Sequence, residues 1–336
     1  MPSRRHTPGI EKAPELGPGP LVGYRGSARF APSQRPFWAD PGARDGARSQ
    51  RPELGRLTPQ FVPELVSFLL EKKMPAFKDI SVEHAGWVAT IEIRRPPHNF
   101  FDIELIRQIA DACEALDQSA DCRAIVLAAQ GTAFCAGAKL GDGADVQDVL
   151  VKKSETGQAG HLYIEAVRLF RTAKPMVGAI HGAAVGGGLG LALVPDLRVT
   201  CPEARFSANF TRLGFHPGFG LTHTLPALIG PAKAAMMCYT SRRVPGEEAY
   251  RIGLADLLVP QSEVRVAAQK LAAEIAENSP LGVLETRATL RAGLADRVRA
   301  ATDIELEKQT RLRRTADFKE GVNAVNERRV PKFVGK

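Results

Sequence analysis

Four glycines between positions 186 and 190 are the first residues whose spacing suggests chemistry. In the stretch HGAAVGGGLGLAL, Gly186 to Gly188 are consecutive and Gly190 follows, among small or aliphatic neighbours. A G-x-G-x-x-G nucleotide loop would need glycine where this chain has Leu191, and no lysine stands where a G-x-x-x-x-G-K-[ST] loop needs it. Two interpretations remain. One is close packing of a helix on a sheet; the other is an oxyanion hole, in which N–H groups at a helix start hold a developing negative charge.

A second loop of small residues favours the oxyanion hole. The stretch AAQGTAFCAGAKLGDG (128–143) follows a continuous apolar run at 124–129, which is typical of a strand buried on both faces. Two such loops at the carboxyl ends of strands could face one ligand.

The elements that must position these loops alternate between strands and helices. In WVATIEI, four residues alternate onto one face of a predicted strand: Trp87, Ala89, Ile91 and Ile93. Asp102 is expected to cap the helix that follows. A helix over 161–172, a buried strand over 175–180, a buried helix that stops at Pro195 and a strand over 197–201 complete a pattern of β–α–β units.

The chain divides by composition into three segments. Residues 1–60 contain 10 Pro and 8 Gly, which predicts a disordered leader over 1–73 with a short amphipathic helix at 61–73. Because the folded pattern starts near Met74, this leader is expected to be either an extension or a gene-start artefact. Its seven acidic residues argue against a mitochondrial transit peptide. A core is expected over 74–260. Charged amphipathic helices at 262–280, 298–314 and 317–329 predict a helical segment over 261–336.

Composition excludes several classes of function. The net charge of +8 is concentrated in the first 75 residues, which hold 12 Lys+Arg and 7 Asp+Glu, and no basic stripe with interleaved aromatics suggests a nucleic-acid partner. The five cysteines form no Cys-x-x-Cys pair, so neither a metal site nor a disulfide framework is expected. No transmembrane span or secretory signal is apparent, and we expect a cytoplasmic protein with no membrane partner.

Three motifs in order resemble the crotonase family, also called the enoyl-CoA hydratase/isomerase family. They are GTAFCAGAKL, KPMVGAIHGAAVGGGLGLAL and DFKEGVNAVNERRVPKFVGK, and the resemblance runs from about Phe77 to Lys336. It implies an α/β fold with a crotonase-like spiral core of ββα turns and a C-terminal helical trimerisation segment. It also implies a homotrimer or a dimer of trimers. The implied ligand is an acyl-CoA, so coenzyme A is part of the substrate and no cofactor is bound permanently.

The resemblance also implies roles for particular residues. The N–H groups of Ala138 and Gly187 match the two oxyanion donors on the thioester carbonyl. The RRPPHN loop and residues of the first glycine loop would lie along the CoA nucleotide, namely Ala136, Ala138, Lys139, Leu140 and Gly141. Lys332 and Phe333 match tail positions that cover the adenine end, often from a neighbouring subunit.

This sequence departs from the family's pattern at the acids. Hydratases of the family carry two glutamates at positions that are Gly190 and Phe210 here, and the position of the isomerase carboxylate is Gly218. None of these three residues ionises, so water cannot be activated by a pair of glutamates there. Phe210 makes the acyl pocket more apolar and suits a bulky or aromatic acyl group.

Other polar groups near the acyl pocket are candidates for proton transfer. His216 is the best of them because histidine titrates near neutral pH; the alternative is a hydrogen-bonded turn histidine before Pro217. Tyr163 could donate a proton or only pack. We expect Asp142 and Asp145 to be solvated or to cap a helix, and His181 to belong to a strand end. The segment 205–224 also offers Ser207, Asn209, Arg212, Thr222 and His223.

Three hypotheses follow, in order of preference. The first is an enzyme that isomerises, hydrolyses or cleaves a carbon–carbon bond through a thioester enolate without the usual glutamates. The second is an acyl-CoA-binding pseudoenzyme or assembly partner. The third is an ordinary enoyl-CoA hydratase. Fold-level resemblance does not fix the reaction.

Overall fold

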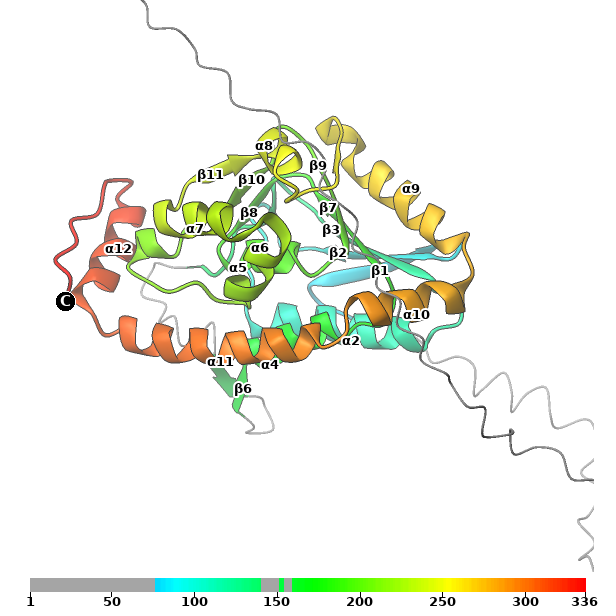
Figure 1. Ribbon diagram of the computed structural model, residues 1–336, viewed down its shortest axis with the longest axis horizontal. Helices are drawn as coiled ribbons and strands as arrows, with labels where there is room; N and C mark the ends of the chain where they lie inside the picture. The colour runs from blue at the N-terminus through cyan, green and yellow to red at the C-terminus, as the bar shows by residue number, and fades with distance from the viewer. Residues whose placement is uncertain (1–75, 140–150, 154–158) are drawn as a thin grey trace, which may run out of the picture. The chain divides into compact units, whose positions relative to one another are not determined.

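The computed structural model describes residues 76–139, 151–153 and 159–336. They all lie in the unit that runs from Phe68 to Lys336, in which alternating strands and helices are followed by helices (Figure 1). The leader over 1–73 and its predicted helix lie outside the described residues. The division at residues 73 and 260 therefore stays a prediction.

The larger sheet has six strands in the order β1-β2-β3-β7-β9-β12. Only β1 pairs antiparallel, with β2, and the other pairs are parallel. The predicted buried strands at 124–129 and 175–180 are confirmed as neighbours in its centre. The strand bounds are β1 Ile80–Ala85, β2 Val88–Ile93, β3 Ala124–Ala129, β7 Met176–Ile180, β9 Leu197–Thr200 and β12 Leu257–Leu258.

The strand predicted over WVATIEI is confirmed as β2, with Ala89, Ile91 and Ile93 fully buried on one face, but Trp87 is not part of it and the strand's other face is buried as well. β2 begins at Val88, and all six of its residues are buried. Helix α2 (Ile103–Gln118) and helix α9 (Val264–Ala276) both pack against it, so neither face meets water. Trp87 lies just outside the strand with 46% of its surface exposed, and the Arg123 guanidinium stacks 3.7 Å from the centre of its ring.

Helices cover the larger sheet on opposite sides (Figure 1). α9 packs along β2, β3, β7 and β9, whereas α2 contacts β1 and β2 and carries α4 (Leu162–Phe170) against its outer side. Asp102 caps α2 as predicted, since its carboxylate accepts a hydrogen bond of 2.9 Å from the amide of Leu105. This cap fixes where the chain turns from β2 into the helix.

A second sheet of four short strands holds the glycine loops. Its order is β11-β10-β8-β4, with bounds β4 Ala133–Cys135, β8 Ala183–Val185, β10 Arg205–Ser207 and β11 Arg243–Pro245. β8 pairs parallel with both β4 and β10, so the loops that follow these strands leave the same edge. The predicted buried helix after the glycines is α5 (Gly187–Ala192), and all its residues are buried. β5 (Val151–Lys153) and β6 (Ala159–His161) form a separate hairpin.

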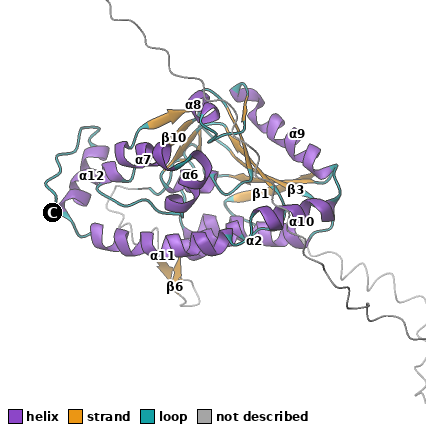
Figure 2. Ribbon diagram, viewed as in Figure 1, coloured by secondary structure: helices purple, strands orange, loops and turns teal. Residues whose placement is uncertain are grey.

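The rest of the chain is mainly helical (Figure 2). α11 lies along α4 and α6, and α12 packs against η1. Within the described residues, none of the helices combines the length and apolar character that crossing a membrane requires. The bounds are η1 Thr211–Leu213, α6 Leu221–Ile229, α7 Pro231–Thr240, α8 Gly246–Arg251, η2 Gln261–Glu263, α10 Pro280–Leu290, α11 Leu294–Leu312 and α12 Ala316–Asn326.

Candidate functional site

The two glycine-bearing loops meet at one cavity of about 590 Å³. Gly137, in the first loop, has φ +84°, and a Cβ atom there would lie 2.6 Å from the Val185 carbonyl oxygen and 3.8 Å from the Gly187 amide nitrogen. A Cβ on Gly188 would lie 2.1 Å from the Cys135 carbonyl oxygen. Only glycine at these positions lets the two backbones approach so closely. The glycines therefore serve packing, and this packing brings the loops to one cavity.

Two backbone amides at this cavity lack an acceptor. Ala138 and Gly187 both line it, and neither amide has a carbonyl acceptor among the described backbone hydrogen bonds. Gly187 is the first residue of α5, where amides have no partner within the helix. By contrast, the Gly186 amide donates to the Ser207 carbonyl over 2.8 Å. Two free N–H donors thus border the same space.

The wall of the cavity is aromatic and aliphatic. Phe210, which the sequence resemblance matches to one of the acid positions, lines it and is only 8% exposed. No carboxylate is found among the described residues that line the cavity. The other apolar side chains there come from Phe101, Leu162, Leu213, Phe215 and Phe219.

The spaces at the other two acid positions are filled by neighbouring rings. A Cβ atom on Gly190 would lie 2.6 Å from the Cβ of Phe219, and Gly190 itself is not among the lining residues. A Cβ atom on Gly218 would lie 2.0 Å from the hydroxyl oxygen of Tyr163. A side chain at either position would therefore require Phe219 or Tyr163 to move.

Tyr163 supplies a polar group inside the cavity. Its hydroxyl donates a 2.7 Å hydrogen bond to the Oε1 of Gln309, whose Nε2 donates over 2.9 Å to the carbonyl of His216. Burial raises the pKa of Tyr163, so the phenol is neutral at physiological pH. Gln309 comes from α11, far along the chain, and nothing in the sequence near the glycine loops pointed to it.

His216 is not among the residues that line the cavity. It is half-buried, and its Nδ1 lies 2.8 Å from the carbonyl oxygen of Pro217. This is the hydrogen-bonded turn histidine that was the alternative to a base. The structure brings its backbone carbonyl into the network with Gln309 but does not place its ring among the residues that line the cavity.

A buried carboxylate holds the loop that follows His216. Glu305 on α11 accepts hydrogen bonds from the amides of Gly220 and Thr222, at 2.8 and 2.9 Å, and from the Thr222 hydroxyl at 2.7 Å. Burial raises the pKa of Glu305, and these three donors act in the opposite direction. Glu305 does not line the cavity, so its role is to fasten the loop and the start of α6 to α11.

The other candidate residues divide between the cavity and its surroundings. Ala136 and Asn209 line the cavity, whereas the His181 ring bonds to the Gly131 carbonyl at a strand end, as expected. The Ser207 hydroxyl donates a hydrogen bond to the Ser241 carbonyl, and the Thr222 hydroxyl donates one to Glu305. Burial lowers the pKa of His223. Lys139 is the last described residue of its loop, so Leu140, Gly141, Asp142 and Asp145 lie outside the described residues.

The tail residues do not reach the cavity of their own chain. The Lys332 amide donates to Glu320 over 2.6 Å, and Phe333 is 42% exposed and not among the lining residues. Within the described part of the chain, no cluster of three or more metal-ligating side chains is present.

His161 lies beside Tyr163 and was not singled out from the sequence. It precedes α4, and its Nδ1 accepts a 3.1 Å hydrogen bond from the Tyr163 amide, while its ring meets the Tyr163 ring edge-on at 4.9 Å. Burial lowers the pKa of His161 to about 4, and the charges of Arg313 and Arg299 act in the same direction. An unprotonated Nδ1 is therefore part of the helix cap.

We expect this cap to make stability depend on pH. The pKa falls from 6.5 in the unfolded chain to about 4 in the folded one, so the contribution is complete above pH 6.5 and is lost as the pH falls toward 4. His161→Asn keeps an acceptor at the cap but does not titrate. Urea unfolding gives the free energy of unfolding at neutral and at acidic pH. Between the two, this free energy should fall by about 1–3 kcal/mol more in the natural protein than in the variant, a range discounted for partial exposure of the ring. Equal losses would show that His161 is not the group responsible.

Comparison with known proteins agrees with this geometry. The enoyl-CoA hydratase/isomerase family model matches residues 83–336. Crotonyl-CoA hydratase of Syntrophomonas wolfei is 31% identical over 264 residues, which cover 78% of this chain and all of the relative. The 1,2-epoxyphenylacetyl-CoA isomerase of Escherichia coli is 28% identical and covers 74% of this chain and 95% of its own.

Solved structures give the same assignment. An enoyl-CoA hydratase/isomerase from Pseudoalteromonas atlantica superimposes with a TM-score of 0.68 at 28% identity, over 76% of this chain and all of the other. The residues that the family model matches, 83–336, include both glycine loops and the C-terminal helices. This chain is therefore a member of the enoyl-CoA hydratase/isomerase family and has the crotonase fold.

Proposed function

We propose that the protein binds an acyl-CoA thioester in this cavity and stabilises its enolate with the amide protons of Ala138 and Gly187. The observation that carries the proposal is the pair of amides without acceptors at an apolar cavity. Negative charge moves onto the thioester oxygen when a proton or a carbon substituent leaves the α-carbon, and also when water adds to the carbonyl carbon in hydrolysis. Donors that already point there stabilise this charge, and losing one typically costs about 3 kcal/mol of barrier.

The reaction that we propose is isomerisation, hydrolysis or carbon–carbon cleavage, and not hydration by paired glutamates. Phe219 fills the space beside Gly190, Tyr163 fills the space beside Gly218, and Phe210 is a phenyl ring. A dry aromatic wall also strengthens the pull of the two amides, because electrostatic interactions grow as the local dielectric falls. It suits a bulky or aromatic acyl group.

A catalytically silent acyl-CoA-binding protein is the second candidate. It is favoured by the neutral hydroxyl of Tyr163, which is already bonded to Gln309, and by the position of the His216 ring outside the cavity. Under this alternative the same two amides would hold a thioester without turning it over.

We also propose a trimer or a dimer of trimers, which analytical ultracentrifugation would test.

A panel of acyl-CoAs incubated with the purified full chain distinguishes these proposals. Products are followed by mass spectrometry, and binding is measured on the same thioesters. We expect turnover of at least one thioester, without addition of water to crotonyl-CoA. Binding of panel members with no product would favour the silent protein. Hydration of crotonyl-CoA at the rate of a control hydratase would refute the proposal.

A further inference from the structure

A groove of about 1660 Å³ lies between the small sheet and α12 and is lined by six arginines. We call it the arginine groove; its arginines are Arg205, Arg212, Arg242, Arg243, Arg328 and Arg329. They lie in β10, in η1, in β11 and the residue before it, and in the segment just after α12. No acidic side chain is among its described lining residues. So many like charges in one groove repel one another unless an anion is bound.

Only part of this charge is neutralised by the protein. Arg242 pairs with Glu248 at 3.1 Å, and Arg329 pairs with Glu320 and Glu327, both at 2.5 Å. Arg205 donates to the backbone carbonyls of Pro202 and Ala204. These contacts satisfy hydrogen bonds of three arginines, but carboxylates offset the charge of only two of them.

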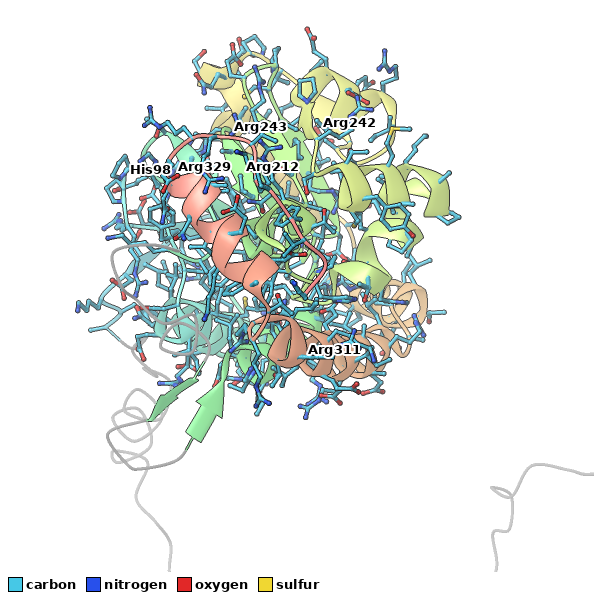
Figure 3. The ribbon with its side chains drawn as sticks, turned by 90° about the vertical axis from the view of Figure 1, so that its left-hand side faces the viewer. His98, Arg212, Arg242, Arg243, Arg311 and Arg329 are labelled. Carbon is cyan, nitrogen blue, oxygen red and sulfur yellow. The ribbon has the colours of Figure 1, made fainter. Side chains whose placement is uncertain are left out.

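Three guanidinium groups remain without a partner. Within the described part of the chain, no ion pair or side-chain hydrogen bond is formed by Arg212, Arg243 or Arg328. Figure 3 shows Arg212 and Arg243 near Arg329 at the end of α12, whereas Arg311 lies well apart from them. A guanidinium presents several N–H donors in a planar fork that matches the oxygens of a phosphate.

The backbone of the groove is also unusual. Four described non-glycine residues have positive φ, and two of them, Ser241 at 52° and Arg328 at 55°, line this groove. Such conformations cost energy and concentrate where a site must be shaped.

Two other lining residues, Val185 and Asn209, also border the thioester cavity, so the two spaces adjoin.

We propose that the arginine groove binds a polyphosphate anion, that is, two or more phosphate groups carried by one ligand. A single carboxylate would offset one of the three unpartnered arginines, whereas adjacent phosphates offset several at once. Two sources can supply this chemistry: the coenzyme A of a thioester in the adjoining cavity, or a free nucleotide or pyrophosphate. The binding itself does not depend on the reaction proposed above.

Pyrophosphate is the probe, and isothermal titration of the full chain is the measurement. We expect saturable binding that weakens as salt is raised. Arg212→Gln/Arg243→Gln should weaken it by about 10-fold per arginine, or about 100-fold together. The matched control is Arg251→Gln/Arg311→Gln, which removes the same charge from arginines outside the groove and should leave the affinity unchanged. Arg→Lys at positions 212 and 243 keeps the charge but loses the fork, and should give an intermediate affinity.

Repeating the titration with coenzyme A present separates the two sources. If the groove holds phosphates of coenzyme A, coenzyme A displaces pyrophosphate, and the groove variant binds both coenzyme A and pyrophosphate more weakly. If it holds a free anion, pyrophosphate binds equally well beside coenzyme A and the groove variant weakens pyrophosphate alone. Either result supports the site. The proposal would be overturned if pyrophosphate did not bind in the millimolar range. It would also be overturned if the control variant weakened binding as much as the groove variant does, or if the groove variant bound pyrophosphate as tightly as the natural protein.

Discussion

Replacing Gly188 by alanine is expected to reduce turnover of any thioester by about 100- to 1,000-fold. A Cβ atom there would lie 2.1 Å from the Cys135 carbonyl oxygen and 2.8 Å from its carbon. These are backbone atoms, so the clash separates the loop that begins after Cys135 from the start of α5. Each loop carries one of the two proposed donors, Ala138 and Gly187. Once the loops part, both amides cannot reach one thioester oxygen.

The substitution should also lower the free energy of unfolding by about 1–3 kcal/mol, as overpacking of a buried site does. Steady-state kinetics and urea unfolding of the same sample separate the two effects, because a folded variant that has lost turnover isolates the loop geometry. Gly282→Ala is the matched control, since its nearest neighbours in exposed α10 are Ser279 atoms at 3.5 Å. It should retain full activity. Unchanged turnover in Gly188→Ala would mean that the closeness of the two loops does not matter.

Introducing the missing acid, as Gly190→Glu, is expected to destabilise the fold without creating a hydratase. A Cβ atom would lie 2.6 Å from the Cβ and 2.8 Å from the Cγ of Phe219, which is 1% exposed. The carboxylate would also be buried without a described partner. Overpacking and an unpaired buried charge together should lower the free energy of unfolding by at least about 3 kcal/mol.

Urea unfolding and the absorbance change of crotonyl-CoA test this expectation. The double variant Gly190→Glu/Phe219→Ala supplies room for the new side chain and should regain part of the lost stability. It should still not hydrate crotonyl-CoA, because the position that we assign to the second acid is Phe210, a phenyl ring that lines the cavity. A fully stable single variant, or one that gains hydration, would show that Phe219 does not close this part of the site.

Local sequence signals predicted the elements of the fold well. The continuous apolar runs at 124–129 and 175–180 became central strands, and the capping residue Asp102 starts α2. These features depend on residues close in the chain. Alternation wrongly placed Trp87 in the strand, which begins one residue later, and it could not reveal that α2 and α9 bury both faces of β2.

The site was predictable to the extent that it is made of backbone. Spacing of glycines and of apolar runs indicated two strand-end loops, and both loops line the one cavity. The side chains that close the cavity were not predictable. Gln309 reaches Tyr163 across 146 residues of sequence, and Phe219 meets Gly190 from a turn in which Phe219 and Gly220 both have positive φ. Such contacts depend on tertiary packing and leave no periodic signal near the glycines.

The central claim is that two backbone amides hold the thioester carbonyl, and infrared difference spectroscopy tests it most directly. Crotonyl-CoA with an isotope-labelled carbonyl is bound to the natural protein and to Gly188→Ala, and the carbonyl stretch is compared with that in solution. Two hydrogen bonds weaken the C=O bond, so we predict a shift to lower frequency in the natural protein and a smaller shift in the variant. A bound thioester whose carbonyl absorbs at its solution frequency in the natural protein would contradict the account.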